Sequence, residues 1–174
     1  MSKSQITIPV KLDAKTFKRF SRFDMFALRK RWVRPVVFAL ILIAFAFVAL
    51  LSGKAQAGLI AAVLLVVGLG LPLVYFGTYF SQVNLQAEKL GLDRPRPVYT
   101  VTLDFDGVRV VNNMKKEDAQ VVRWNDVQAA FRKKGCIYLY VSPVKAYLLP
   151  NGQANVSDDE LWAYLKEHLG DKAK

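Results

Sequence analysis

The residue types that perform covalent catalysis are scarce in this chain. It has one cysteine, Cys136, and one histidine, His168. A nucleophile needs a base within hydrogen-bonding reach, yet Cys136 falls in a predicted strand and His168 in the last turn of a predicted helix. A histidine at a helix end usually caps the helix or lies on the surface. We therefore predict no catalytic residue and no enzymatic activity.

Clustered metal ligands are scarce as well. The counts of cysteine and histidine exclude a zinc site of the usual kind, which leaves only oxygen-ligated ions. Asp104 and Asp106 form a carboxylate pair, but they flank a predicted hairpin turn and lack the other positions of a calcium loop. Asp158, Asp159 and Glu160 fit the first turn of a helix, where acidic groups oppose the dipole. We predict no metal and no cofactor.

Basic residues supply the remaining chemistry. Two clusters fall in predicted loops, Lys115-Lys116 and Arg132-Lys133-Lys134, and Arg19 and Arg22 lie in the N-terminal arm. If these groups face a bilayer, each adds about 1 kcal/mol of attraction to anionic lipid. If they face away, they are ordinary solubilising residues. They are our candidate contacts for lipid or for a partner. Nucleic acid is not a predicted partner, because membrane topology already explains the largest basic block.

The composition requires apolar and basic residues to be segregated along the chain. The 174 residues are 53% hydrophobic and carry a net charge of +11. Residues 1–34 hold ten lysines and arginines against two acidic residues. No residue from Pro35 to Leu51, or from Ala55 to Phe80, is charged. We predict a membrane α-helical hairpin over residues 35–80, with spans at about 33–53 and 57–80.

Charge on the flanks predicts the orientation of this hairpin. Lysines and arginines crowd its outer ends, whereas the turn between the spans holds only Lys54. The positive-inside rule therefore places both termini in the cytoplasm. Three aromatic residues near the predicted cytoplasmic ends of the spans are the expected interfacial anchors: Trp32, Tyr75 and Tyr79.

A secretory signal is the alternative interpretation of the first span. Ala55-Gln56-Ala57 fits a cleavage motif directly after an apolar run. However, the basic region before the run exceeds thirty residues, and the run is longer than the core of a normal signal. Even after cleavage there, the second span returns the following domain to the cytoplasm. We therefore favour the hairpin.

The N-terminal arm, residues 1–34, predicts a strand and a helix. Gln5 to Leu12 has apolar residues at alternate positions, and Pro9 favours a place at a sheet edge, where the strand completes the sheet of the C-terminal domain. Asp13 is a good N-cap for a helix from Ala14 to about Arg31. Its mixture of phenylalanines and basic residues suits a helix on the membrane surface; alternatively, the phenylalanines pack on the domain.

The C-terminal region predicts an α+β domain. Residues 81–97 extend the second span as a helix to Leu90 and form a proline-rich linker, and residues 98–174 form the domain. Short strands are predicted at 99–105, 108–111, 119–124, 129–132, 136–141 and 147–149. Ser157 to Glu160 is a capping box that opens a C-terminal helix. A small antiparallel sheet or partly open barrel, capped by one helix, is the outline of a pleckstrin-homology-like (PH-like) domain.

Four short segments resemble a known family, the YcxB-like bacterial membrane proteins. They are the turn beginning at Phe105-Asp106, the segment Arg123-Trp124-Asn125-Asp126-Val127, the strand Ile137-Tyr138-Leu139-Tyr140 and the ending Leu148-Leu149-Pro150. The resemblance implies two transmembrane helices and a PH-like C-terminal domain in the bacterial inner membrane, and it implies no established activity. After Pro150 this chain has Asn151-Gly152 in place of the basic residue that the family pattern leads us to expect.

These observations predict a non-catalytic, membrane-anchored cytoplasmic interaction module. It binds or regulates a protein partner, in an accessory or immunity-type role, or it assembles as a homo-oligomer in the lipid bilayer. The alternative function is recognition of anionic lipid headgroups at the inner membrane surface.

Overall fold

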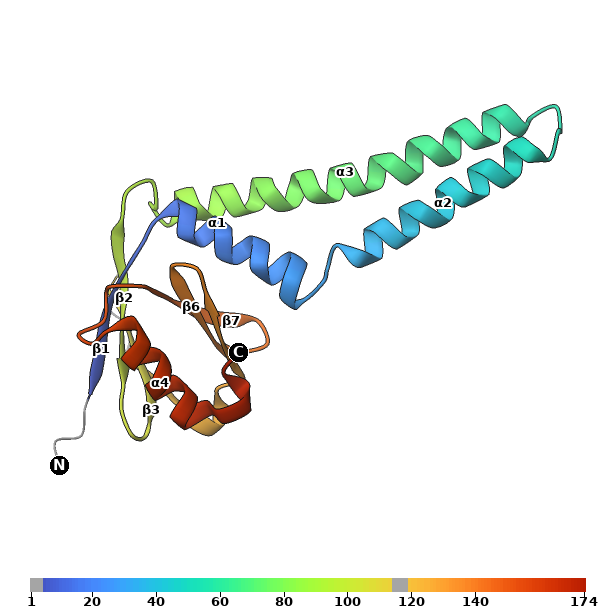
Figure 1. Ribbon diagram of the computed structural model, residues 1–174. Helices are drawn as coiled ribbons and strands as arrows, with labels where there is room; N and C mark the ends of the chain where they lie inside the picture. Colours follow the sequence, from blue (N-terminus) through green and yellow to red (C-terminus); the bar gives the residue numbers. More distant parts are fainter. Residues whose placement is uncertain (1–4, 114–118) are drawn as a thin grey trace. The chain divides into compact units, whose positions relative to one another are not determined.

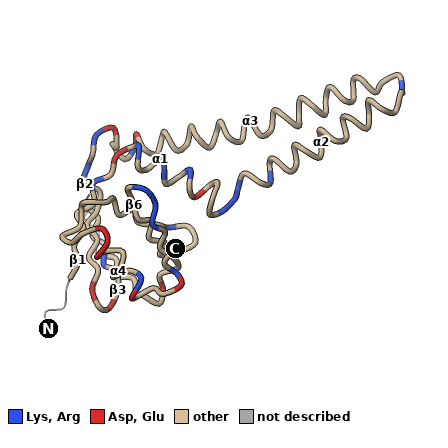
Figure 2. Tube along the Cα trace, in the orientation of Figure 1, with Lys and Arg blue, Asp and Glu red and all other residues tan. Residues whose placement is uncertain are grey.

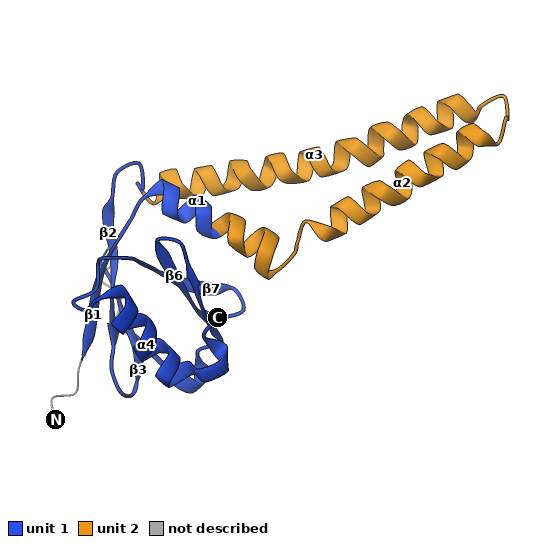
Figure 3. Ribbon diagram, in the orientation of Figure 1, with its two compact units in different colours: residues 1–20, 91–174 blue, residues 21–90 orange. Residues whose placement is uncertain are grey.

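The computed structural model describes residues 5–113 and 119–174, so the predicted Lys115-Lys116 cluster lies outside the described residues. The chain forms two compact units (Figure 3). One consists of Met1–Phe20 and Gly91–Lys174, and the other of Ser21–Leu90. The N-terminal strand therefore belongs to the same unit as the C-terminal domain.

Two long helices, α2 (Val33–Leu51) and α3 (Ala57–Lys89), form most of the second unit (Figure 1). By length and composition, each helix is able to cross a membrane. In the apolar stretch of 18 residues within each helix, only 11% is buried. The core helix of a soluble protein would be mostly buried. The two predicted spans are thus confirmed as helices of membrane-spanning length and hydrophobicity.

Small side chains allow α2 and α3 to pack closely. A Cβ atom added at Gly68 of α3 would lie 3.2 Å from the Cβ of Leu42 in α2. Between residues 35 and 80, the buried positions are small residues on both helices: Ala39, Ala46, Ala57, Ala61 and Gly68. Its large apolar side chains point outward, as shown by Leu51 and Leu73, which are 87% and 72% exposed. The hairpin is therefore held by close backbone packing, and its large apolar side chains cover the outside.

The helix of the N-terminal arm begins as predicted and ends differently. Helix α1 (Ala14–Phe23) starts where the Thr16 amide donates to the Asp13 carboxylate at 2.8 Å. Hydrogen bonding from the Thr16 side chain, together with this amide, lowers the pKa of Asp13. The prediction of one helix to about Arg31 is wrong, because the chain changes to a π-helix (η1, Asp24–Leu28). An ion pair of 2.9 Å between Asp24 and Arg29, five residues apart, fits the wider π turn.

The first sheet combines a strand that precedes the hairpin with three strands that follow it. Its strands are β1 (Ile6–Leu12), β2 (Arg96–Leu103), β3 (Gly107–Asn112) and β4 (Gln120–Arg123), in that antiparallel order. The predicted edge position of the N-terminal strand is confirmed, and Pro9 lies opposite Thr100. One face of β1 is buried in the core through Ile6, Ile8, Val10 and Leu12.

The second sheet and a helix complete this unit. Strands β5 (Ala129–Lys133), β6 (Cys136–Ser142) and β7 (Lys145–Pro150) are antiparallel in that order. Helix α4 (Asp158–Leu169) opens with the predicted capping box at Ser157 and buries Leu161, Trp162, Leu165 and Leu169. Short 3₁₀ turns lie at Trp124–Asp126 (η2) and Gly170–Lys172 (η3). The predicted small antiparallel sheet is thus two sheets, of four and three strands, and neither closes into a barrel.

Polar groups from elsewhere in the chain occupy two edges of these sheets. Asn155 exchanges hydrogen bonds with the backbone of Thr7, and Gln153 does so with the backbone of Lys11, so the outer edge of β1 is paired on both sides of Pro9. The backbone of Lys174 bonds to Ala130 and Arg132 along β5. Such cover keeps an edge from pairing with another chain.

A tyrosine hydroxyl occupies the edge of β7. The Tyr99 hydroxyl, from β2, accepts from the Leu148 amide at 2.8 Å and donates to the Leu148 carbonyl at 3.1 Å. One side chain therefore satisfies both backbone groups of a buried residue and links the two sheets. Burial raises the pKa of Tyr99 far above its ordinary value.

Replacing Tyr99 with phenylalanine should destabilise this unit. The substitution keeps the ring but leaves two buried backbone groups of Leu148 unpaired, which we expect to cost about 1–3 kcal/mol. Urea unfolding of the full chain in detergent, followed by tryptophan fluorescence, measures the loss. The matched control is Tyr147→Phe, which removes a bond to the exposed Gln120 side chain. Equal loss in the two variants would contradict the role given to Tyr99.

Candidate functional site

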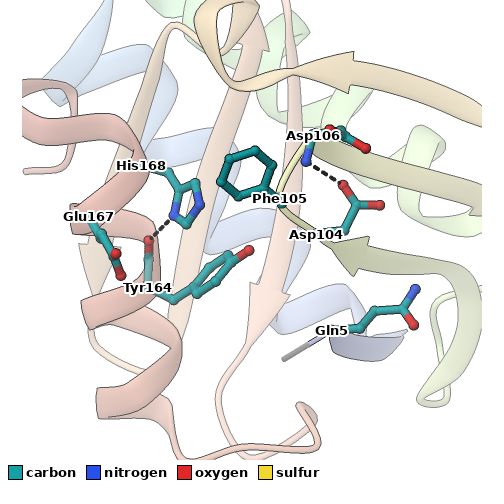
Figure 4. A pocket seen from close by; sticks show the side chains of 7 residues that line it. All are labelled: Gln5, Asp104, Phe105, Asp106, Tyr164, Glu167 and His168. Atoms are coloured by element: carbon teal, nitrogen blue, oxygen red, sulfur yellow. Dashed lines mark hydrogen bonds between the residues drawn. The ribbon is translucent and has the colours of Figure 1, made fainter. Parts of the chain in front are cut away.

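A cavity of about 570 Å³ lies between the β2–β3 turn and helix α4 (Figure 4). All of its lining residues belong to the sheet-containing unit. They combine carboxylates, aromatic rings and an imidazole: Gln5, Asp104, Phe105, Asp106, Tyr164, Glu167 and His168.

The β2–β3 turn is built around Asp104. Its carboxylate accepts hydrogen bonds from the amides of Asp106 and Gly107, each at 3.0 Å. Gly107 is required there, because an added Cβ would lie 2.2 Å from the Val122 carbonyl oxygen. The Asp104 carboxylate thus stabilises the turn by these hydrogen bonds. Phe105 lies at the tip of the turn, with 71% of its surface exposed.

Helix α4 supplies the opposite wall. Tyr164 and His168 lie one helical turn apart, and their rings are in contact, with centroids 4.3 Å apart and planes tilted by 33°. The Trp124 ring lies 4.7 Å from the imidazole and 6.0 Å from the Tyr164 ring, so the three rings form one cluster. The Nδ1 atom of His168 is 2.9 Å from the Tyr164 carbonyl, which can only accept, so Nδ1 carries a proton. The imidazole is therefore fixed in place by this cluster of rings and by its hydrogen bond.

This arrangement suits a positively charged group better than a metal ion. Within residues 5–113 and 119–174, no three histidine, cysteine, aspartate or glutamate residues are grouped to hold a metal. Asp106 and Glu167 bring carboxylates to the cavity, and the rings of Phe105 and Tyr164 offer apolar and π surfaces. A lysine or arginine side chain has both features, a cationic head and an apolar stem.

The structure brings some of the predicted basic contacts together. A guanidinium nitrogen of Arg19 donates to the Lys134 carbonyl at 3.0 Å, so α1 is hydrogen-bonded to the turn between β5 and β6. Arg132 pairs with Asp159 of α4 at 2.6 Å. Lys133 at the end of β5 and Lys134 in the turn are both exposed. The prediction that this cluster lies in a loop is therefore wrong for Arg132 and Lys133, which belong to the strand. Arg22 is also exposed, but it belongs to the other compact unit.

One phenylalanine of the arm, Phe20, follows the second of the two alternatives. Phe20 lies against β6, with its ring 5.2 Å from that of Tyr138 and 6.0 Å from that of Tyr140. At this end of α1, therefore, an aromatic face packs on the sheet.

The three predicted anchor residues lie in the helical unit. The Trp32 indole donates to the Phe26 carbonyl at 3.2 Å, and the Tyr79 hydroxyl donates to the Ser21 carbonyl at 2.7 Å. Tyr75 is 36% exposed. The Tyr79 bond thus ties the arm to α3, whereas the Trp32 bond lies within the arm. The role of these residues as interfacial anchors stays a prediction.

The cavity of Figure 4 was not predicted from the sequence. The Asp104 and Asp106 pair was noticed and assigned to a turn, which the hydrogen bonds of Asp104 confirm. The sequence analysis did not predict that this turn lines a cavity together with Tyr164, Glu167 and His168, which follow it by about sixty residues in the chain. Only the exposed phenylalanine between two aspartates hinted at a binding site.

Comparison of this chain with protein-family models, curated protein sequences and solved structures gives no match.

The only cysteine is buried in the core. Cys136 is 1% exposed, and burial raises the pKa of its thiol to about 12. The hydrogen bond from the Leu149 backbone and the charge of Arg19 oppose this shift without cancelling it. Because the thiolate is the reactive form, the folded protein presents almost none of it near neutral pH.

Cys136 should therefore resist thiol reagents. At pH 8 a pKa of about 12 leaves about one thiolate in ten thousand, roughly a thousandfold less than for a thiol of pKa 9. Iodoacetamide labelling of the folded chain should be correspondingly slow, and faster by about tenfold for each unit of rising pH. The control is Cys136→Ser combined with Val144→Cys, since Val144 is 79% exposed. Equal labelling rates would contradict the burial of Cys136.

Proposed function

We propose that this chain is a membrane-anchored, non-catalytic interaction module. Helices α2 and α3 anchor it as a two-span protein of the bacterial inner membrane, with both termini in the cytoplasm. The unit with the two sheets binds a protein partner there, and the partner presents a lysine or arginine to the cavity of Figure 4.

The path of the chain supports the two-span anchor. Strand β1 precedes the hairpin and β2 follows it, and the two strands pair over seven residues. Backbone pairing cannot form across the hydrocarbon region, so β1 and β2 lie on the same side of any membrane that the hairpin enters. Two crossings return the chain to its starting side. The basic residues at the outer ends of the hairpin make that side the cytoplasm.

The observation that carries the binding proposal is the exposed ring of Phe105 beside carboxylates. An aromatic side chain that is 71% exposed at a cavity is a typical anchor for a partner. Asp106 and Glu167 give the cavity a negative character that a basic partner segment complements. Strand addition at β1, β5 or β7 is less favoured, because these edges already carry hydrogen bonds from other parts of the chain.

The fold supports a PH-like assignment for this unit. A four-stranded antiparallel sheet, a three-stranded antiparallel sheet and a C-terminal helix follow in that order along the chain. Together with two apolar helices, this order agrees with the resemblance to the YcxB-like family, to which we propose that the chain belongs.

Recognition of anionic lipid headgroups is the second candidate function. Exposed Lys133 and Lys134 favour it, because their turn is held firmly by Arg19. Arg132 contributes less, since its ion pair with Asp159 offsets its charge.

Cysteine labelling tests the orientation of the hairpin. In a Cys136→Ser background, Lys54→Cys places a thiol in the turn between the spans, and Val144→Cys places one in the sheet unit. A membrane-impermeant maleimide should label Lys54→Cys in intact spheroplasts and Val144→Cys only after permeabilisation. The reverse pattern would contradict a cytoplasmic domain. Labelling of both sites in intact spheroplasts would contradict the two-span anchor.

Co-purification tests the binding site. We expect Phe105→Ala, and separately Asp106→Asn with Glu167→Gln, to reduce the partner recovered from native membranes by at least about tenfold. The matched control is Val144→Ala, which removes an exposed apolar side chain of the β6–β7 turn. Recovery of the wild-type chain alone, without a stoichiometric partner, would overturn the proposal, and equal losses in control and test variants would move the site elsewhere.

A further inference from the structure

A second cavity, of about 500 Å³, lies in the helical unit where the segment before α2 meets α3. Four of its six lining residues are cations and none is acidic: Arg29, Lys30, Arg31, Arg34, Pro35 and Tyr75. Figure 2 shows the basic residues gathered along the segment between α1 and α2. These residues did not enter the binding site proposed above.

The backbone between α1 and α2 is folded so that basic side chains close together in the sequence line the same cavity. Lys30 has a φ of 47°, the only positive φ of a residue other than glycine in the described parts of the chain. The Arg31 amide donates to the Met25 carbonyl at 3.0 Å, and the Val33 amide donates to the Lys30 carbonyl at 3.0 Å. A left-handed residue in a tight connection of this kind is common at binding sites. Here it gathers side chains that an extended segment would spread apart.

Two further contacts hold the cations in position. The Arg29 guanidinium pairs with Asp24 at 2.9 Å, which orients it and offsets one of the four charges. Phe26 stacks on Phe76 of α3 with ring centroids 6.2 Å apart and planes 8° apart. The segment is thereby fixed against α3, and the cavity keeps an excess of positive charge.

The chemistry of the lining matches a phosphate attached to an apolar molecule. An arginine guanidinium can bind two phosphate oxygens at once, in a bidentate arrangement. The first turn of α2 adds the positive end of a helix dipole. Pro35 and Tyr75 add apolar surface beside the cations. A choline headgroup would bring its own cation among these cations, whereas an anionic headgroup would not.

We propose that this cavity binds the phosphate of an anionic phospholipid headgroup. The proposal rests on the membrane anchoring proposed above, because α2 enters its uncharged stretch at Pro35 and so places the cavity at headgroup depth. The site selects anionic over zwitterionic lipid and is separate from the turn that holds Lys133 and Lys134.

Native mass spectrometry of the full chain in detergent tests this site. The chain is titrated with phosphatidylglycerol, with phosphatidylcholine and with glycerol 3-phosphate. We expect the wild-type chain to retain phosphatidylglycerol in preference to the other two. Arg31→Gln with Arg34→Gln should weaken that binding by at least about tenfold, because two phosphate ligands are lost. The control, Arg109→Gln with Arg123→Gln, removes the same charge from two exposed arginines of β3 and β4 and should leave binding unchanged.

Three outcomes would overturn the proposal. They are equal retention of phosphatidylcholine, equal binding of glycerol 3-phosphate, and a loss of phosphatidylglycerol binding in the control pair but not in the test pair. Circular dichroism of each variant checks that the helices persist. Carbonate extraction of membranes separates this proposal from the anchoring: wild-type chain that is extracted contradicts the anchor, whereas wild-type chain that stays in the membrane without lipid preference contradicts only the headgroup site.

Discussion

Antiparallel pairing between β1 and β2 joins two segments that are separated in sequence by the whole apolar hairpin. Seven residue pairs form this ladder, and the buried face of β1 supplies four core side chains through Ile6, Ile8, Val10 and Leu12. The amide of Ala14, just beyond β1, bonds to the Leu92 carbonyl at 2.9 Å, just before β2. The two ends of the hairpin are therefore held together by the folded unit from which they emerge.

Polar side chains form hydrogen bonds with backbone groups at sheet edges that have no neighbouring strand. Asn155 and Gln153 act as a substitute strand along β1, and the hydroxyl of Tyr99 does the same at one residue of β7. A small domain with two short sheets has several edges to protect for its size. Long-range side-chain bonds achieve this without additional strands, and the α4 side of the unit is left to form the cavity with Phe105 at its rim.

Local patterns were sufficient for most elements and insufficient for the sites. The capping box at Ser157, the cap at Asp13, the alternation in β1 and the uncharged spans depend on neighbouring residues, so the sequence predicted them. The π-helix after Phe23 was missed because it depends on an ion pair and on packing against α3. Both cavities were missed for a similar reason, since each is formed by residues far apart in the sequence, such as Phe105 with His168 or Arg31 with Tyr75.

The insertion of the hairpin between β1 and β2 also sets an order of events during synthesis. About eighty residues separate the end of β1 from the start of β2, so at about 5–20 residues per second the ribosome needs roughly 4–16 seconds to supply the partner strand. During that interval the apolar residues of β1 have been synthesised, but the strands that bury them have not. Strand β1 therefore joins its sheet only after the whole hairpin has been synthesised.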